Sequence, residues 1–339
     1  MKHEVDLEKY QIHTDLAIDL IDEKRYLKGV RQSIKNIDGI KVTDVNLKSD
    51  NALFKKSGNY VTIEFEDITD TSNYNKVKKI VTKEIKKMLK KMNINDNASC
   101  LFIGLGNSNS TPDSLGPKSS KDILVTNHIY ELGGLSDEYR RVSAITPSVT
   151  GLTGIETSDI IISIVNKIKP DFIVAVDALA SGSVERLNKT IQMTDTGIHP
   201  GSGIGNQRRE ISFESINIPV LAIGVPTVVG ANVIVSDTIN YMYKHYSFNK
   251  EYLKNPKSKL TFNNVDYLKE TVKLDDKEKK ELFGLVGSLN DDEVKDLISE
   301  VLSPIGYNLM VTPKEIDFII PRLATLISSS INDSLHFIK

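Results

Sequence analysis

Short apolar runs separated by amphipathic stretches dominate the middle of the chain. Five runs stand out: CLFIGLG from Cys100, VSAITPSV from Val142, FIVAVDALA from Phe172, TIQMTDTG from Thr190 and VLAIGVPTVV from Val220. Most of them are continuous rather than alternating, which is typical of strands buried on both faces of a parallel sheet. The pattern therefore predicts an α/β fold, with a largely parallel sheet flanked by helices.

Helical spacing of apolar residues marks several segments around these runs. It predicts helices over 16–37, 73–92, 156–170 and 231–246. The second helix has its apolar residues on one face: Val77, Ile80, Val81, Ile85, Met88, Leu89 and Met92. Its other side carries eight lysines, which is typical of a solvated helix surface, although contact with an acidic or nucleic-acid-bound partner is an alternative.

The regions before and after the apolar runs give weaker signals. Residues 52–67, ALFKKSGNYVTIEFED, predict two extended segments joined at Ser57 and Gly58. Beyond residue 246 the chain is polar to about residue 280 and then helical to about residue 302. We expect one α/β domain with a helical C-terminal extension from about residue 247.

The sequence TPKE predicts where the last helix begins. Thr312 can be its N-cap, Pro313 its first residue, and Glu315 can complete a capping box. Pro321 follows about two turns later and should kink or end this helix, because proline removes a backbone hydrogen bond.

Composition narrows the class of protein. The chain has 339 residues, 40% of them hydrophobic and 26% charged, as in soluble globular proteins. Its net charge of −2 gives no general attraction to nucleic acid or membranes. The polar N-terminus and the lack of long apolar runs argue against a secretory signal or membrane helix, so we expect a cytoplasmic protein. The single cysteine, Cys100, rules out an intrachain disulfide and is expected to be a buried thiol.

Three aspartates follow predicted strands, where ligands and catalytic groups gather in open parallel sheets. They are Asp113, Asp177 and Asp195. Asp113 can instead be an N-cap, and Asp195 can bond its own turn. Asp177 is harder to explain structurally, because an ionised carboxylate after an apolar run needs partners or a shifted pKa. Two carboxylates held close together can activate water and protonate a leaving amine, which is peptide hydrolysis.

The loop TDTGIHPGSG, from Thr194 to Gly203, allows several interpretations. Its Asp-Thr-Gly is the pepsin-type motif, but those enzymes need two copies in an all-β fold. As a phosphate loop it lacks the Gly-Lys-Ser/Thr signature. As part of a metal site, His199 would join Asp113 and Asp177 as ligands of a catalytic zinc ion, although the spacing matches no helix-borne metal motif.

Longer motifs carry a resemblance to a known family. TPDSLGP, VDALASGSVERLNKTIQMTDTGIHPGSGIGNQRREIS, IGVPTVVGANVIVSDTI and NLMVTPKEID closely resemble the germination protease of endospore-forming bacteria, over nearly the whole chain. The resemblance implies a core similar to that of hydrogenase maturation proteases, with helical C-terminal additions. It also implies an atypical aspartic-type endopeptidase, historically grouped with metallopeptidases, that needs no cofactor.

The resemblance further implies a substrate and a setting. The family degrades small acid-soluble spore proteins during spore germination. A member is expected in the cytoplasm of the spore core as a homotetramer, with no direct nucleic-acid or membrane partner.

The resemblance also implies roles for single residues. The two essential aspartates of the family fall on TPDSLGP and VDAL, hence Asp113 and Asp177, with no metal ligands. Asp195, His199 and Gly201 belong to an active-site loop.

A self-processing site follows from the same resemblance. The family is made as a zymogen that removes its own leader after an acidic residue and before an apolar residue and alanine. In IHTDLAID that bond is Asp15–Leu16, so residues 1–15 would be a propeptide and 16–339 the peptidase domain. From the residues alone, Asp15 is equally a helix N-cap.

Two other functions stay open. The first is a metal-dependent endopeptidase of the hydrogenase-maturation type, with Asp113, Asp177 and His199 as ligands. The second is a non-catalytic module that binds an anionic ligand through the loop from Gly197 to Arg209. Activity that survives chelation would argue against the first, and tight phosphate binding without peptide cleavage would favour the second.

Overall fold

The computed structural model describes residues 15–19, 29–48, 55–199, 209–254, 274–302 and 309–336. The chain divides into two compact units. The larger comprises His13–Val228 and Thr312–Lys339, and the smaller comprises Met1–Ile12 and Val229–Val311. The division expected after residue 15 is a cleavage site for the propeptide, not a boundary between packed units. It stays a prediction.

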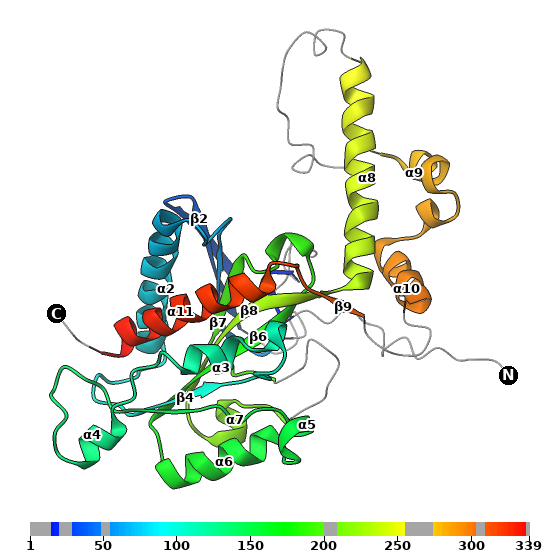
Figure 1. Ribbon diagram of the computed structural model, residues 1–339. Helices are drawn as coiled ribbons and strands as arrows, with labels where there is room; N and C mark the ends of the chain where they lie inside the picture. The colour runs from blue at the N-terminus through cyan, green and yellow to red at the C-terminus, as the bar shows by residue number, and fades with distance from the viewer. Residues whose placement is uncertain are drawn as a thin grey trace. The chain divides into compact units, whose positions relative to one another are not determined.

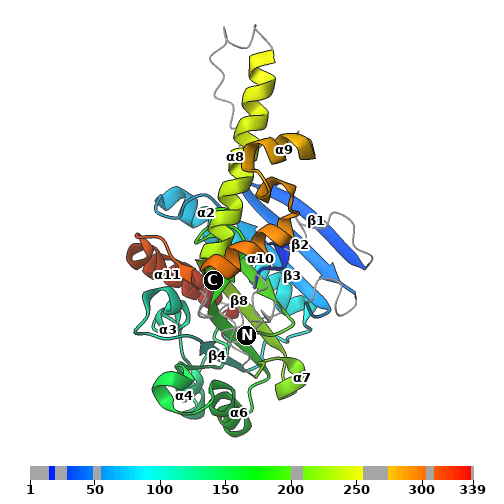
Figure 2. The ribbon, with the colours of Figure 1, turned by 90° about the vertical axis from the view of Figure 1, so that its right-hand side faces the viewer.

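Among the described residues, nine strands form one sheet that organises the fold (Figures 1 and 2). Its order is β1 (Val30–Ile37), β2 (Ile40–Leu47), β3 (Gly58–Glu64), β7 (Thr190–Thr194), β8 (Val220–Gly230), β6 (Phe172–Ser181), β4 (Cys100–Gly104) and β5 (Val142–Ile145), while β9 (Met310–Val311) pairs with the end of β8. Strand β4 is parallel to β5 and β6, whereas β1, β2, β3, β7 and β8 are successively antiparallel. The predicted α/β fold is confirmed, but the expectation of a largely parallel sheet is wrong. The sheet is mixed, because the meander β1–β3 and strands β7 and β8 pair antiparallel.

Helices cover both faces of this sheet in the larger unit (Figure 1). On one face, α2 (Thr71–Lys91) packs against α11 (Ile316–Leu335), which also contacts α3 (Leu115–Ser120). On the other face, α6 (Thr157–Ile168) shares a core with Leu16. The shorter elements are η2 (Thr111–Asp113), α4 (Asn127–Glu131), α5 (Thr150–Thr153), η3 (Val184–Arg186) and α7 (Phe213–Ile216).

The core of the larger unit confirms two predictions. The predicted apolar face of α2 is buried, except that Met92 is partly exposed. Asp70 caps this helix by accepting a hydrogen bond from the Asn73 amide at 2.8 Å. Cys100 is a buried free thiol, and burial raises its pKa to about 12.

The smaller unit is largely helical in its described parts. It contains α8 (Ala231–Lys254), α9 (Asp276–Phe283), η7 (Val286–Ser288) and α10 (Asp291–Leu302). Helix α10 packs on α8, and the Tyr243 and Phe283 rings meet edge to face at 5.1 Å. The helix predicted over 231–246 is confirmed and continues through residue 247 to Lys254. Among the described residues, no helix is long and apolar enough to cross a membrane.

The helix predicted over 16–37 is wrong from Val30 onward, and residues 20–28 lie outside the described part. Val30–Ile37 is strand β1, paired antiparallel with β2. The two strands are joined at Asp38 and Gly39, which both have positive φ (52° and 87°), as a tight hairpin turn requires. Most β1 side chains are exposed, so backbone pairing and turn geometry decide this structure rather than apolar periodicity.

The hairpin predicted for residues 52–67 is half right. Gly58–Glu64 is a strand, but its partners are β2 and β7. Residues 52–54 lie outside the described part of the chain. The pairing follows chain order in a meander from β1 to β3.

The predicted start of the last helix is also wrong. Helix α11 begins at Ile316. The Thr312 hydroxyl donates instead to the Thr227 carbonyl at 2.8 Å. Pro321 lies inside α11 but does not end it, because the buried residues around it, among them Ile320 and Leu323, are held in the core.

Two glycines let the segment after β4 lie directly on the strand ends. A Cβ at Gly116 would be 2.2 Å from the Leu105 carbonyl oxygen and 2.5 Å from that of Val176. A Cβ at Gly104 would be 2.4 Å from the Gly116 carbonyl oxygen. Because these neighbours are backbone atoms, they cannot move aside as a flexible side chain would. The approach fixes the segment carrying Asp113 against β6.

Replacing Gly116 by alanine should test this approach. We expect Gly116→Ala to lower the free energy of unfolding by about 2 kcal/mol or more, because overpacking against backbone forces a local shift. Gly151→Ala is the control, since nothing lies within 4 Å of its Cβ position. Denaturant unfolding measures both. Equal stability of the two variants would contradict the expected close packing.

Candidate active site

Asp177 lies in β6 at the point where the neighbouring strand β4 ends. The last paired residues of these strands are Gly104 and Val176, so Asp177 is the first residue of β6 past that end. Its side chain is buried, with 5% of its surface exposed. One carboxylate oxygen accepts a hydrogen bond from the Ala178 amide at 2.9 Å. Strand β6 continues beyond it to Ser181.

Asp113 ends the short helix η2, which follows β4. The Asn107 amide donates to an Asp113 carboxylate oxygen at 2.9 Å and to its carbonyl oxygen at 3.0 Å. Asp113 is not the N-cap of α3, because Ser114 occupies that position. Helix η2 contacts β6. The structure therefore brings the segments that carry Asp113 and Asp177 together at one edge of the parallel strands.

Residues 15–19 are packed into the same region. Leu16 and Ala17 are fully buried. The Asp15 amide donates to the Ala180 carbonyl oxygen at 3.1 Å, and the Ala180 amide donates back to the Asp15 carboxylate at 2.8 Å. Asp15 is thus bound to β6 three residues beyond Asp177.

Side-chain alternation places Leu16 on the same sheet face as Asp177. Leu16 belongs to a core cluster with Ala175 and Leu179. Since side chains two residues apart in a strand share a face, Asp177 lies between these two on that face. The peptide bond from Asp15 to Leu16 therefore lies on the sheet face to which Asp177 belongs, beside the part of β6 that follows it.

Two side chains that the sequence analysis missed bind the Asp15 carbonyl. The Gln192 amide nitrogen lies 2.9 Å from the Asp15 carbonyl oxygen, and the Lys55 amine lies 3.2 Å from it. Gln192 also accepts a hydrogen bond from the Ala17 amide at 2.6 Å. The one available signal was Gln192 itself, a polar residue inside the apolar run TIQMT, which needs buried partners.

Ionic contacts hold the other end of this segment. Asp19 accepts a hydrogen bond from the Gly182 amide at 2.7 Å and pairs with Arg186 at 2.5 Å. Arg186 also pairs with Glu64 at 3.3 Å. Burial lowers the pKa of the Lys55 amine, and the carboxylates of Asp15 and Asp19 oppose that shift.

Asp195 has a different environment from the other two aspartates. Its two carboxylate oxygens accept hydrogen bonds from Asn59, one from the backbone amide at 2.8 Å and one from the side-chain amide at 2.7 Å. These bonds tie the end of β7 to β3. Asp195 therefore fastens the base of its loop.

His199 lies at the start of the loop and is half exposed. Its Nε2 is 3.2 Å from Glu210, which also pairs with Lys56. A two-residue bridge between Ile198 and Ile211 closes the base of the loop. Gly201 lies in residues 200–208, outside the described residues. In the part of the chain that the structure describes, no three His, Cys, Asp or Glu side chains form a group able to hold a metal ion.

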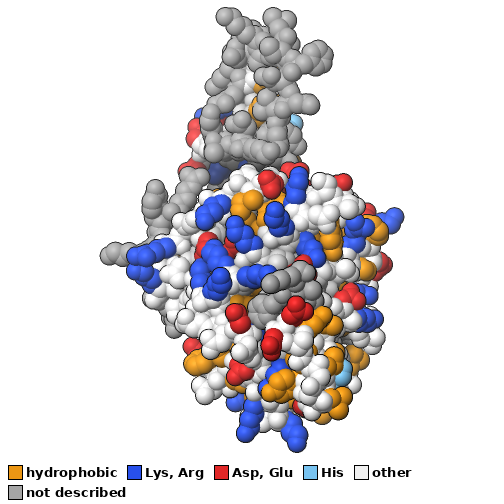
Figure 3. Space-filling model, turned by 90° about the vertical axis from the view of Figure 1, so that its left-hand side faces the viewer, with side chains coloured by type: hydrophobic (Ala, Val, Ile, Leu, Met, Phe, Trp, Pro, Cys, Tyr) orange, Lys and Arg blue, Asp and Glu red, His pale blue; other side chains and the backbone are white. Residues whose placement is uncertain are grey.

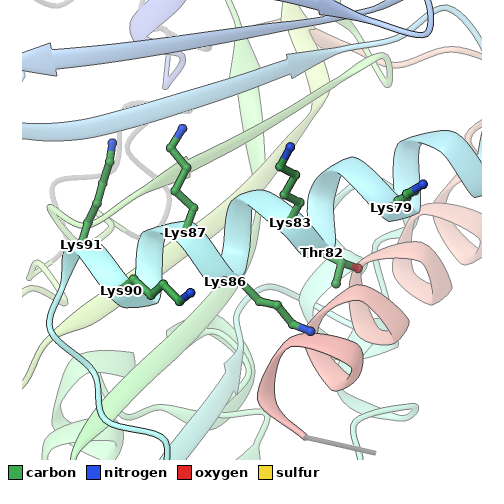
Figure 4. Close-up of a pocket in the computed structure, with 7 residues that line it drawn as sticks. All are labelled: Lys79, Thr82, Lys83, Lys86, Lys87, Lys90 and Lys91. Atoms are coloured by element: carbon green, nitrogen blue, oxygen red, sulfur yellow. The ribbon is translucent and has the colours of Figure 1, made fainter. Parts of the chain in front are cut away.

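Six lysines of α2 line a groove on the surface of that helix: Lys79, Lys83, Lys86, Lys87, Lys90 and Lys91 (Figure 4). Lys87 and Lys91 point toward β2, where both pair with Asp44, at 2.8 and 3.3 Å. Lys86 and Lys90 point to the other side in the same view. Basic and acidic side chains are interspersed on the face shown in Figure 3. This arrangement is typical of a solvated helix surface.

Comparison with known proteins identifies relatives of the chain. A family model described as germination protease matches residues 7–338. A germination protease from Priestia megaterium is 44% identical, covering 99% of this chain and 96% of the relative. One from Bacillus cereus is 46% identical with the same coverage. A NiFe hydrogenase maturation protease from Thermococcus kodakarensis is 17% identical, covers 38% of this chain and 74% of its own, and superposes with a TM-score of 0.26.

The geometry of Asp195 predicts a structural effect on substitution. Asp195→Ala should lower the free energy of unfolding by about 2 kcal/mol, since hydrogen bonds to a charged group are lost and the Asn59 amide is left unpaired. Peptide cleavage by the folded fraction should fall less than about tenfold. Asp137→Ala, at an exposed position, is the control for unfolding. A loss of cleavage as large as that of Asp177→Asn, with unchanged stability, would contradict this role.

The Lys56–Glu210 pair predicts a dependence of stability on pH. Burial opposes the shift, but the hydrogen bond and the positive charge of Lys56 lower the pKa of Glu210 below its usual 4.5. A lowered carboxyl pKa adds stability above pH 4.5, which is lost as pH falls through the folded-state pKa. Because the pair is partly exposed, the difference between the parent and Lys56→Met should be at most about 1 kcal/mol at pH 7. It should shrink below pH 4.5 in unfolding titrations, and a constant difference down to pH 3 would contradict it.

Proposed function

The chain belongs to the germination protease family, and from this premise we propose that it is a self-processing endopeptidase that activates water with Asp113 and Asp177. The family makes the chain a peptidase of spore germination. The observation that carries the proposed mechanism is the packing of the Asp113 segment against β6 beside Asp177. The loop around Asp195 and His199 forms a wall of the site.

The proposed reaction is direct attack by water. One aspartate accepts a proton from the water, whose oxygen bonds to the carbonyl carbon of the scissile peptide. The second aspartate donates its proton to the leaving nitrogen as the carbon–nitrogen bond breaks. The immediate products are a carboxylic acid and an amine, which become a carboxylate and an ammonium group when the acid gives its proton to the amine. The aspartate pair returns to sharing one proton.

The first substrate in this proposal is the chain itself. Residues 1–15 form a propeptide, and cleavage occurs between Asp15 and Leu16. The support is the docked position of Asp15 on β6 and the complete burial of Leu16 and Ala17. An uncut leader held in this way occupies the site that another protein would need.

The further substrates are small acid-soluble spore proteins, within the cytoplasm of the spore core. The support is family membership and the acidic–apolar–alanine order at Asp15, Leu16 and Ala17. In the same proposal the enzyme is a homotetramer without a cofactor. The metal-dependent alternative needs ligands beyond the three that the sequence indicated, because Asp113, Asp177 and His199 form no metal-binding group.

The test is self-cleavage of the full-length protein. The parent should lose residues 1–15 over time, as measured by intact mass, with or without chelator. Asp113→Asn and Asp177→Asn should each slow this loss by at least about 10³-fold, because the amide neither accepts nor shares the proton. Asp137→Asn is the matched control on the surface.

Three outcomes would count against parts of this proposal. Loss that stops with chelator and returns with added zinc would favour the metal-dependent peptidase. Cleavage at another bond would remove Asp15–Leu16 as the processing site. Normal cleavage in either aspartate variant would contradict the paired-aspartate mechanism.

A further inference from the structure

We propose that Lys55 and Gln192 form the oxyanion site of this peptidase, the pair of donors that stabilises negative charge on the carbonyl oxygen of Asp15 during cleavage. The proposal rests on the proposed function, since it assigns roles at the bond that function cleaves. It assigns a role to Lys55, which precedes β3, and to Gln192, which lies in β7. Neither lies in the two aspartate motifs.

The carbonyl of Asp15 has an unusual pair of partners. Its oxygen accepts hydrogen bonds from the Gln192 side-chain amide at 2.9 Å and the Lys55 amine at 3.2 Å. These donors come from segments more than a hundred residues apart in sequence. Two donors that converge on one carbonyl oxygen are what acyl transfer requires, because charge develops on that oxygen in the transition state.

The orientation of Gln192 is fixed by a second contact. Its side-chain oxygen accepts a hydrogen bond from the Ala17 amide at 2.6 Å, so its side-chain nitrogen must face Asp15. Gln192 is 6% exposed and lies in the middle of β7, between β3 and β8. A donor held in a buried strand needs little reorganisation when charge develops, which makes its hydrogen bond more effective than one in water.

Lys55 adds a second donor to the same oxygen. Its amine lies 3.2 Å from the Asp15 carbonyl oxygen and interacts with the carboxylates of Asp15 and Asp19. Burial lowers the pKa of this amine, and the two carboxylates oppose that shift. An N–H group of the amine donates whether or not the amine is protonated. It binds the charged oxygen of the tetrahedral intermediate more strongly than the neutral carbonyl, so its effect falls on the rate.

The donors fit the atom balance of hydrolysis. When water adds to the Asp15 carbonyl carbon, the oxygen gains the electron pair of the C=O bond, and Lys55 and Gln192 bind this oxyanion. When the bond to the Leu16 nitrogen breaks, the pair returns to the C=O bond, and the nitrogen takes its proton from the aspartates. Neither donor gains or loses a proton in the cycle.

The two donors also set which residues can flank the scissile bond. The Ala17 side chain is fully buried in a cluster with Val45, Leu47 and Tyr60. A larger residue at position 17 would move its own amide away from Gln192. The Asp15 carbonyl would then rotate out of hydrogen-bonding distance of Lys55 and Gln192. Small size at this position is therefore coupled to correct placement of the carbonyl.

Self-cleavage of the full-length chain tests the proposal with two near-isosteric changes. Gln192→Glu keeps an oxygen for the Ala17 amide but removes the donor to Asp15. Lys55→Met keeps most of the unbranched stem of the side chain and removes the amine that donates to Asp15. Each should slow the loss of residues 1–15 by about 10²–10³-fold, the usual effect of removing one oxyanion donor. Lys35→Met and Gln32→Glu, on the exposed strand β1, are matched controls.

Hydrogen exchange separates a chemical role from simple anchoring. In both variants, the amides of Ala17 and Ala180 should stay protected, because their own acceptors remain. Slow cleavage with preserved protection supports an oxyanion role. Protection that falls in proportion to the rate would overturn it, since the residues would then only dock the segment.

The proposal and the proposed function fail in distinguishable ways. If the parent cleaves at Asp15–Leu16 and Asp177→Asn does not, while Lys55→Met and Gln192→Glu cleave at the parent rate, the oxyanion site is wrong and the peptidase assignment stands. If the parent leaves this bond intact, the self-processing proposal fails, and the oxyanion assignment fails with it.

Discussion

The close contact of Gly116 with the backbone of β4 and β6 is the constraint on which the candidate site depends. A side chain at this position would meet the carbonyl oxygens of Leu105 and Val176. Only without one can η2 and α3 lie on the strand ends and place Asp113 beside β6. Backbone packing in the buried part of the sheet therefore sets the geometry of the site. It fixes the positions of the segments that carry Asp113 and Asp177.

In the proposed function, the docked segment of residues 15–19 gives this site a second role. Its backbone is bound by Ala180 and Gln192, and its apolar side chains are buried as in a folded core. The same contacts would hold a leader in place and present its peptide bond to the aspartates. The contacts that block the site before cleavage would then also position the leader for cleavage. Removal of the leader would free Lys55 and Gln192 to bind the peptide bond of another protein.

Much of the larger unit could be predicted from the sequence. The strands from β4 to β8 and helices α2 and α6 follow from continuous apolar runs and helical periodicity, because these elements are buried on one or both faces. Helical periodicity also predicts α8 in the smaller unit. Strand β1 could not be found in this way, since its side chains are exposed and only its pairing holds it; the Asp38–Gly39 turn was the one local signal. The start of α11 was misjudged because Thr312 bonds Thr227, a tertiary partner that capping rules do not include.

For the site, the sequence pointed to Asp113 and Asp177, and the structure places their segments together. No motif marks Lys55 and Gln192, because their proposed role depends on where residues 15–17 dock.

In the proposed mechanism, water itself attacks the Asp15 carbonyl carbon. A single round of self-cleavage in H₂¹⁸O, followed by mass spectrometry of both fragments, tests it most directly. We predict one ¹⁸O in the released residues 1–15, in the new carboxylate of Asp15, and none in the fragment from Leu16. Label in a carboxylate of the larger fragment would show attack by an aspartate and contradict the account.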